Sequence, residues 1–377
     1  MQYREMTGGD KVSVLGFGCM RFQTNKDGSI KEDKASKQLL YAINNGVNYL
    51  DTAKIYHGGR SEPFVGKFLE ENKLRDKVYI ATKLSHWLLG EKKSMDMHFK
   101  EQLKDLRTDY IDYYLVHSLD GKSWAKLKEL GVLKFLDKIR KQKKIRNVGF
   151  SFHGNIEHYY QIVDDYDWSF CQIQFNILDT DYQAGMKGYL YAVKKGLSVI
   201  SMEPLRGGRL AQMPPDEVKK IYAGSGLKRT PAEWALRWVW NYQGIATLLS
   251  GMNQMKQIKE NIRISNTALP GSMTREELQI IEKVTKVYKK LMKINCTGCM
   301  YCLPCPYNVA IPACFEYYNG YHLYNDEKYK NYYKNFLGDK AKASLCVNCG
   351  KCVPKCPQGL KIPELLKKVV KEFEGVN

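Results

Sequence analysis

Long apolar runs are absent from this chain of 377 residues. None approaches the ~20 apolar residues that a membrane-spanning helix needs. The N-terminal stretch MQYREMTGGDKVSVLG has no apolar signal core either. We therefore expect a cytoplasmic protein. Because nothing indicates secretion, we expect no structural disulfides.

Cysteine is scarce in the first three quarters of the chain. Of 11 cysteines, only Cys19 and Cys171 precede residue 295. This change in composition marks a boundary within the basic stretch KVTKVYKKLMK (283–293). We predict a large domain over residues 1–288 and a small domain over 289–377, as the chain length allows.

Two cysteine runs fill the predicted small domain: CTGCMYCLPCP (296–306) and CVNCGKCVPKCP (346–357). Closely spaced cysteines on a tight loop bind one [4Fe-4S] cluster, and in two-cluster ferredoxins the cysteine before proline ligates the other cluster. The predicted ligands of cluster one are Cys296, Cys299, Cys302 and Cys356. Those of cluster two are Cys346, Cys349, Cys352 and Cys305.

The two runs form an internal repeat, because CPYNVAIP follows the first and CPQGLKIP the second. One difference is that Cys302 and Cys305 enclose two residues, whereas Cys352 and Cys356 enclose three. Two structural zinc sites are the alternative, although zinc prefers well-separated cysteine pairs. Cys314 is left over, either as a buried small apolar residue or as a replacement for Cys305. Exposed clusters indicate an anaerobic or low-oxygen cell.

The large domain alternates apolar strands with amphipathic helices. Strands are expected at 14–18, 47–53, 78–84, 111–117, 145–151, 170–175, 197–203 and 245–251. Helices are expected at 33–45, 61–72, 94–107, 124–142, 181–195, 230–241 and 254–263. Eight such units predict an α/β fold, a (β/α)8 TIM barrel, followed by a small, mainly helical ferredoxin-like domain. A doubly wound sheet is disfavoured because no G-x-G-x-x-G turn follows the first strand.

Polar residues cluster at the ends of three successive predicted strands. They are Asp51, Lys83 and His117, and Tyr56 follows Asp51 in the next loop. Barrel active sites collect such residues from the carboxyl ends of strands. An ammonium beside a phenol stabilises phenolate, an aspartate holds the ammonium in place, and a histidine orients a carbonyl oxygen.

At these positions the chain resembles the aldo/keto reductase family. The resemblance is carried by LGFGCMRF (15–22), NYLDTAKIYHGGRSE (48–62), ATKL (81–84), LRTDYIDYYLVH (106–117), NVGFS (147–151), QIQFNILD (172–179) and GMNQMKQIKEN (251–261). Joined to the cysteine runs, it looks like the branch of the family fused to a bacterial-type ferredoxin domain. The resemblance implies that Asp51, Tyr56, Lys83 and His117 are a catalytic tetrad, and that NADPH or NADH reduces an aldehyde or ketone.

The resemblance also implies a cofactor site. Its residues are Ser151, Gln172 and Met202 near the nicotinamide, Arg206 and Gly207 after strand seven, and Gly251, Asn253, Lys256, Glu260 and Asn261 after strand eight. Two of these positions depart from the family pattern, because Phe152 stands where asparagine is usual and Met202 where tyrosine often stacks on the ring. Glu203 occupies a position often held by a small residue.

The two domains handle electrons differently, because hydride transfer moves two electrons and each cluster takes one. A flavin such as FMN would take up two electrons together and release them one at a time, although the sequence has no separate flavin motif. Without a flavin, the clusters are either structural or receive electrons from a reduced ferredoxin. The alternative to a carbonyl oxidoreductase is an electron-transfer protein whose barrel holds a cofactor or docks a partner.

The formal net charge is +19. It suggests an acidic ferredoxin or flavodoxin as partner, although solvated lysine-rich helix faces explain it equally well. The lysines are dispersed and no nucleic-acid-binding module is recognisable. Trp87 and Trp124 are expected at the mouth of the substrate pocket, with core packing as the alternative.

Overall fold

The computed structural model describes residues 1–90, 94–267 and 269–375. The chain divides into two compact units. The first comprises Met1–Pro204 and Ala235–Met273, and the second Leu205–Trp234 and Thr274–Asn377. The predicted domain boundary at residue 288 lies within helix α11 (Arg275–Leu291) and stays a prediction.

Eight parallel strands of the first unit close into a barrel in the order β10-β3-β4-β5-β6-β7-β8-β9. They are β3 (Leu15–Gly18), β4 (Tyr49–Asp51), β5 (Tyr79–Leu84), β6 (Ile111–Leu119), β7 (Ile145–Phe152), β8 (Phe170–Gln174), β9 (Ser198–Met202) and β10 (Ile245–Ser250). All eight predicted strands are present, so the predicted TIM barrel is confirmed.

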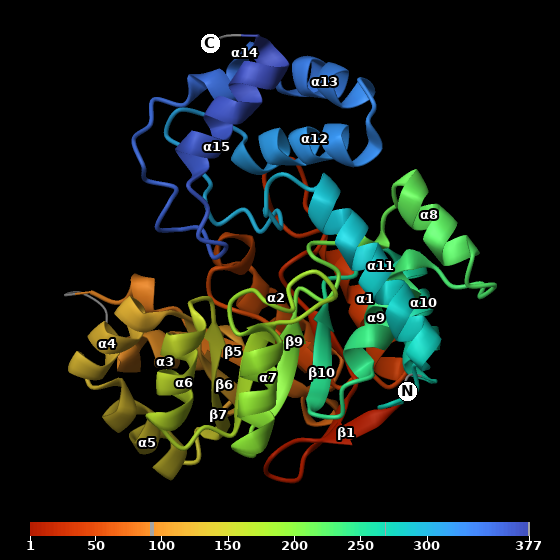
Figure 1. Ribbon diagram of the computed structural model, residues 1–377. Coiled ribbons are helices and arrows are strands. Elements are labelled where there is room, and N and C mark those ends of the chain that lie inside the picture. Colours follow the sequence, from red (N-terminus) through yellow and green to blue (C-terminus); the bar gives the residue numbers. More distant parts are fainter. Residues whose placement is uncertain (91–93, 268, 376–377) are drawn as a thin grey trace. The chain divides into compact units, whose positions relative to one another are not determined.

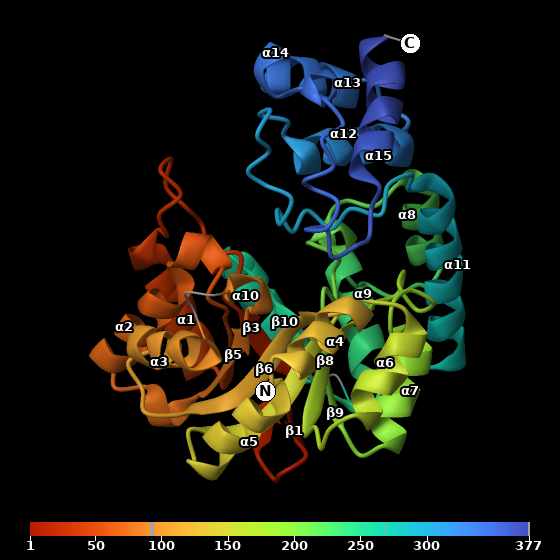
Figure 2. The same ribbon diagram turned by 90° about the vertical axis from the view of Figure 1, so that its left-hand side faces the viewer.

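Helices surround these strands. They are α1 (Glu32–Asn44), α2 (Ser61–Glu71), α3 (Met95–Asp105), α4 (Gly121–Glu129), α5 (Val132–Lys141), α6 (Ile156–Asp164), α7 (Gly185–Lys194) and α10 (Met255–Ser265). Figure 1 shows α3, α6 and α7 outside the strands. In the turned view α2 and α3 lie on one side of the strands and α6 and α7 on the other (Figure 2). Helix α9 (Pro231–Trp240) begins in the second unit and ends in the first.

One detail of the helix prediction was wrong. The predicted helix 124–142 is two helices, because Gly131 adopts a left-handed conformation with φ of 79° between α4 and α5. Helix α6 follows β7, as eight β-α units require, and its N-cap is visible in the sequence. The Asn155 side chain accepts a hydrogen bond from the backbone N–H of His158 and so satisfies one of the amides that a helix start leaves unpaired.

An antiparallel hairpin of β1 (Tyr3–Glu5) and β2 (Lys11–Ser13) precedes the barrel and was not predicted. One apolar cluster joins this hairpin to the barrel strands. Met6 and Val12 come from the hairpin, and Tyr49, Ala81, Tyr113, Leu115, Phe170, Ile200, Ala246 and Leu249 from the barrel. Gly16 makes room for this packing, since a Cβ there would lie 3.3 Å from Cδ1 of Tyr49. This packing leaves the ends of the strands as the place for a site.

The second unit is mainly helical. Besides α11 it contains α8 (Asp216–Ala223), α12 (Ile311–Tyr324), α13 (Lys328–Tyr332), α14 (Gly338–Ala341) and α15 (Ile362–Val369). Helices α12 and α15 begin at the same offset after the two cysteine runs, each with proline in its first turn. The repeat in the sequence is therefore a repeat of loop and helix.

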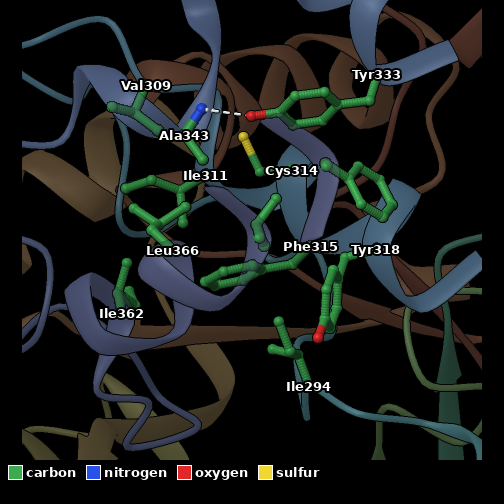
Figure 3. Close-up of a cluster of buried hydrophobic side chains, with 12 residues drawn as sticks. Ile294, Val309, Ile311, Cys314, Phe315, Tyr318, Tyr333, Ala343, Ile362 and Leu366 are labelled. Atoms are coloured by element: carbon green, nitrogen blue, oxygen red, sulfur yellow. Dashed lines mark hydrogen bonds between the residues drawn. The ribbon is translucent and has the colours of Figure 1, made fainter. Parts of the chain in front are cut away.

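One apolar core joins the two halves of this repeat (Figure 3). Its buried residues are Ile294, Val309, Ile311, Cys314, Phe315, Tyr318, Tyr333, Ala343, Ile362, Leu366, Val369 and Phe373. The backbone N–H of Ala343 donates a hydrogen bond of 2.7 Å to the Tyr333 hydroxyl. Six of the predicted ligand cysteines pack against this core, namely Cys296, Cys302, Cys305, Cys346, Cys352 and Cys356.

Among the described residues, no helix combines the length and the apolar character needed to cross a membrane.

A buried carboxylate links the N-terminal ends of β5 and β6. Asp112 is 1% exposed and accepts a hydrogen bond of 2.9 Å from the backbone N–H of Ile80. The Arg75 guanidinium lies 2.9 Å and that of Arg146 3.4 Å from its oxygens. Burial raises the pKa of the Asp112 carboxyl, and Arg75 opposes this shift.

We expect Asp112→Ala to lower the free energy of unfolding by about 3–5 kcal/mol, because it leaves a partly buried guanidinium and a buried N–H unpaired. Denaturant unfolding followed by tryptophan fluorescence measures this. Asp167→Ala is the matched control, since its side chain is 86% exposed and its pair with Arg140 is worth less than about 1 kcal/mol. Equal losses in both variants would contradict a structural role for Asp112.

Candidate active site and candidate cluster sites

The predicted tetrad comes from three neighbouring strands of the barrel. Asp51 is the last residue of β4, Lys83 lies in β5 and His117 in β6. Tyr56 begins the short helix η1 (Tyr56–Gly59) in the loop after β4. Because β4 pairs with β5 and β5 with β6, all in parallel, these side chains meet at one edge of the barrel.

Lys83 and Asp51 form a fully buried ion pair. The Lys83 Nζ atom lies 2.7 Å from both carboxylate oxygens and 2.9 Å from the carbonyl oxygen of Thr52. The two side chains are 0% and 3% exposed. Burial raises the pKa of the Asp51 carboxyl, and the Lys83 ammonium opposes this shift. The pair fixes an ammonium group at a defined point of the barrel edge.

Tyr56 lies beside this ammonium. The Lys83 Nζ atom is 5.1 Å from the centroid of the Tyr56 ring. The ring is 7% exposed and stands edge-on to His117, with 6.3 Å between ring centroids. The structure therefore brings all four predicted residues together in one cluster.

His117 is buried, and its surroundings disfavour the charged form. Burial lowers the pKa of His117 well below its usual value, and Lys83, His153, His86 and His98 lower it further. The Nδ1 atom of His117 lies 3.1 Å from the Ser85 hydroxyl. A neutral imidazole held in this way serves as a hydrogen-bonding group rather than as a cation.

The two predicted pocket tryptophans differ. Trp87 is 42% exposed and its ring centroid lies 4.9 Å from that of His117, and its place at a pocket mouth stays a prediction. Trp124 is 1% exposed, donates a 2.7 Å hydrogen bond to Asp165 and packs against Trp168. For Trp124 the alternative of core packing therefore holds.

Three predicted nicotinamide residues lie on consecutive strands, Ser151 on β7, Gln172 on β8 and Met202 on β9. The Ser151 hydroxyl accepts a 2.7 Å hydrogen bond from the backbone N–H of Ser118. Gln172 is 3% exposed and its Nε2 lies 3.7 Å from the Met202 sulfur. Its buried Oε1 has no hydrogen-bond partner. Such an acceptor fits the amide group of a nicotinamide.

Two of the five predicted residues after β10, Asn253 and Asn261, form hydrogen bonds that hold this part of the chain. Asn253 donates a 3.0 Å bond to the Arg21 carbonyl, and its own carbonyl accepts from Gln23 and Gln38, each at 2.7 Å. Asn261 is buried and donates to the Ser250 hydroxyl. Lys256 is exposed in the first turn of α10, and Glu260 is half-buried on the same helix.

Sequence reasoning missed Arg21. Its guanidinium pairs with Glu203 at 3.6 Å, and its side chain lies over Gly251, where a Cβ would approach it to 2.9 Å. Arg21 thereby balances the acidic residue that stands in place of a small one. Only the three-dimensional structure joins these residues, since the sequence separates them widely.

Arg206 and Gly207 belong to the second unit, with Arg206 2% exposed. Its guanidinium donates to Asn295, the residue before Cys296, and lies 3.4 Å from the Met292 sulfur. Burial raises the pKa of the Cys296 thiol, and the nearby charges of Arg209 and Arg206 oppose this shift. Within the second unit, these arginines are thus neighbours of the first cysteine run.

The eight predicted cluster cysteines fall into the two expected groups. The pKa of Cys302 is raised by burial and by the nearby thiols of Cys299, Cys296 and Cys356. The pKa of Cys352 is raised by burial and by the nearby thiols of Cys346, Cys305 and Cys349. Each group therefore combines three cysteines of one run with the last cysteine of the other run.

The two loops share one backbone conformation. Left-handed residues occur at matched positions: Gly298 with φ of 65° and Asn348 with 56°, Met300 with 67° and Gly350 with 70°, and Asn308 with 57° and Gly359 with 58°. At these positions the left-handed conformation turns each cysteine run back on itself. The internal repeat in the sequence is thus a repeat in structure.

A cavity of about 240 Å³ is lined by all four cysteines of the second group, Cys305, Cys346, Cys349 and Cys352, and also by Cys302 of the first. Over the described residues, no three His, Cys, Asp or Glu side chains converge on a single metal ion. Four thiols around a cavity of this size are the donor set of a multi-iron cluster, whose ligands stand farther apart than the four of one zinc ion. The donor set therefore fits a cubane better than zinc.

Cys314 takes no part in either group. It is 0% exposed within the apolar core of the second unit, and its thiol approaches the Ala341 carbonyl at 3.9 Å. Burial raises the pKa of Cys314 to about 12. It is a buried apolar residue, as the first of the two expectations had it.

Comparisons with known proteins agree with this architecture. Residues 14–285 match the model of the aldo/keto reductase family, and residues 295–361 match that of the 4Fe-4S dicluster domain. An aldo-keto reductase structure from Bacillus halodurans, in its holo form, is similar with a TM-score of 0.62 and 26% identity, covering 75% of this chain and 96% of that one.

Two curated proteins are similar in sequence. The uncharacterized oxidoreductase YqkF of Bacillus subtilis is 25% identical over 310 residues, covering 74% of this chain and 95% of YqkF. Aryl-alcohol dehydrogenase (NADP+) of Phanerodontia chrysosporium is 32% identical over 137 residues, covering 32% of this chain and 33% of that protein.

We expect Cys349→Ala to lose about half of the iron, because one cluster of two loses a ligand. Cys314→Ala is the matched control and should keep all of it. Iron content and visible absorption of anaerobically purified protein measure both. Full iron in Cys349→Ala, or a loss in Cys314→Ala, would contradict the ligand sets.

Proposed function

Because the chain belongs to the aldo/keto reductase family and carries a 4Fe-4S dicluster domain, we propose that this oxidoreductase reduces an aldehyde or ketone with NAD(P)H and exchanges single electrons through two [4Fe-4S] clusters. The observation that carries the proposal is the buried cluster of Asp51, Lys83, Tyr56 and His117. Such a combination of an acid, its activating ammonium and a neutral hydrogen-bond donor is suited to protonating a carbonyl oxygen.

In this proposal Tyr56 gives its hydroxyl proton to the substrate oxygen. The Lys83 ammonium stabilises the phenolate that remains, and Asp51 holds the ammonium in position. His117, neutral and bound through Nδ1 to Ser85, would use Nε2 to orient the carbonyl oxygen. The nicotinamide, when bound, supplies the hydride to the carbonyl carbon, so that two electrons and two protons are accounted for.

The choice of nicotinamide rests on two observations. The unpartnered Oε1 of Gln172 suits a carboxamide N–H, and the similar aryl-alcohol dehydrogenase is named for NADP+. Ser151 and Met202 would complete the contacts to the ring, and Gly251, Asn253, Lys256, Glu260 and Asn261 the remaining ones. No observation favours FMN, the alternative cofactor.

The eight cysteines would hold the clusters. Each cluster takes up one electron when reduced, and a protein such as an acidic ferredoxin or flavodoxin would deliver these electrons one at a time. The hydride, in contrast, already carries both electrons of the carbonyl reduction. The alternative is an electron-transfer protein whose barrel only holds a cofactor. An electron-transfer role does not explain why a buried lysine ammonium lies beside Tyr56, whereas carbonyl reduction does.

We expect Tyr56→Phe to lower kcat for reduction of 4-nitrobenzaldehyde by NADPH by ~10²–10⁴-fold, the usual value of a general acid. NADPH binding, followed by fluorescence, should persist because the phenol contacts the substrate. Tyr160→Phe, a tyrosine on α6 outside the barrel, is the matched control. A normal rate in Tyr56→Phe would refute the tetrad.

Anaerobic visible spectra test how the clusters are reduced. We expect a photoreduced deazaflavin to bleach the cluster absorption and NADPH alone to leave it unchanged, because a nicotinamide does not readily release electrons singly. Bleaching by NADPH alone would mean that the barrel holds a flavin. Acid extraction and flavin fluorescence would then identify it.

A further inference from the structure

The two halves of the repeat have the same backbone conformation but differ in the charge of their side chains. Between Ile294 and Phe315 the chain has no charged side chain. Between Asp339 and Glu364 it has five lysines and no acid. Because the two loops match apart from one additional residue, this contrast is specific to one half and is separate from the general lysine content of the chain.

The matched positions show where the extra charges lie. Lys351 stands where the first half has Tyr301, and Lys361 where it has Ala310. Lys355 is the additional residue between Cys352 and Cys356, which has no counterpart between Cys302 and Cys305. The insertion that distinguishes the second run therefore adds a positive charge to its loop.

These charges lie next to the second cysteine group. Lys351 and Lys355 line the same cavity of about 240 Å³ as Cys305, Cys346, Cys349 and Cys352. Both lysines are exposed, and neither has an acidic partner within the described parts of the chain. Lys361, in contrast, is 3.8 Å from Glu364. Two uncompensated charges thus border the cavity.

The second group is also the more accessible one. Cys349 is exposed, whereas the other seven predicted ligands are half-buried. Two apolar side chains at the cavity are exposed as well, Val347 at 56% and Tyr307 at 45%. An apolar centre bordered by charged residues is the usual composition of a protein–protein contact site.

We propose that Val347, Tyr307, Lys351 and Lys355 form the docking surface for a small acidic electron-carrier protein, which delivers electrons to the cluster held by Cys305, Cys346, Cys349 and Cys352. The inference rests on the proposed function, because it needs a cluster in this cavity. Positive charges steer an acidic partner and hold it in register. The short path through exposed Cys349 then favours transfer, in which the carrier loses one electron and the cluster gains it.

The test uses the full chain with both clusters, mixed anaerobically with a reduced acidic ferredoxin while cluster bleaching is followed by stopped flow. We expect Lys351→Glu combined with Lys355→Glu to lower the second-order rate constant at least ~10-fold at low ionic strength. In the unsubstituted protein the rate should fall as salt is added. In the double variant it should no longer fall.

Two controls separate the surface from the cluster. Lys134→Glu combined with Lys141→Glu changes the net charge equally on exposed positions of α5 and should keep most of the rate. Photoreduced deazaflavin, which is uncharged, should bleach both double variants equally, and their iron contents should match. Equal ferredoxin rates in the two double variants would overturn the docking surface. Absence of iron from the unsubstituted protein would instead overturn the cluster assignment, and this proposal with it.

Discussion

The buried ion pair between Lys83 and Asp51 is the interaction on which the barrel site depends. An ammonium group with 0% exposure is costly to bury unless its charge and its N–H groups are satisfied. The carboxylate of Asp51, at the end of the adjacent strand β4, and the carbonyl of Thr52, the next residue, satisfy them. Because both residues sit on barrel strands, the ammonium has one position relative to Tyr56. The chemistry of the site therefore depends on strand pairing.

The sequence allowed this cluster to be predicted because each member marks a strand end or the loop after it. Residues at the ends of parallel strands converge whatever the details of packing. The same reasoning does not predict the ion pair of Arg21 and Glu203, which joins loops 182 positions apart. It also does not predict the contact of Arg206 with Asn295, which are 89 positions apart. Those pairs depend on tertiary packing, for which local spacing carries no signal.

The cysteine groups were predictable for a different reason. Spacing within each run limits which thiols can face one centre, and the proline after the last cysteine identifies the one that crosses over. The left-handed residues that shape the loops were only partly visible. Gly298, Gly350 and Gly359 could be predicted to adopt this conformation, because glycine favours it. Asn348, Asn308 and above all Met300 adopt it because the matched loop requires it. The repeat was therefore a better guide than residue type.

The two cysteine groups have different positive neighbours, and the difference follows from side-chain chemistry. A cubane with four thiolates is anionic, so cations nearby stabilise it. Cys296 has the guanidinium groups of Arg206 and Arg209 nearby, and guanidinium groups tolerate burial because they are weakly hydrated. Cys349 has ammonium groups, which are strongly hydrated and stay at the surface. Arginine thus suits a half-buried thiol such as Cys296, and lysine an exposed one such as Cys349.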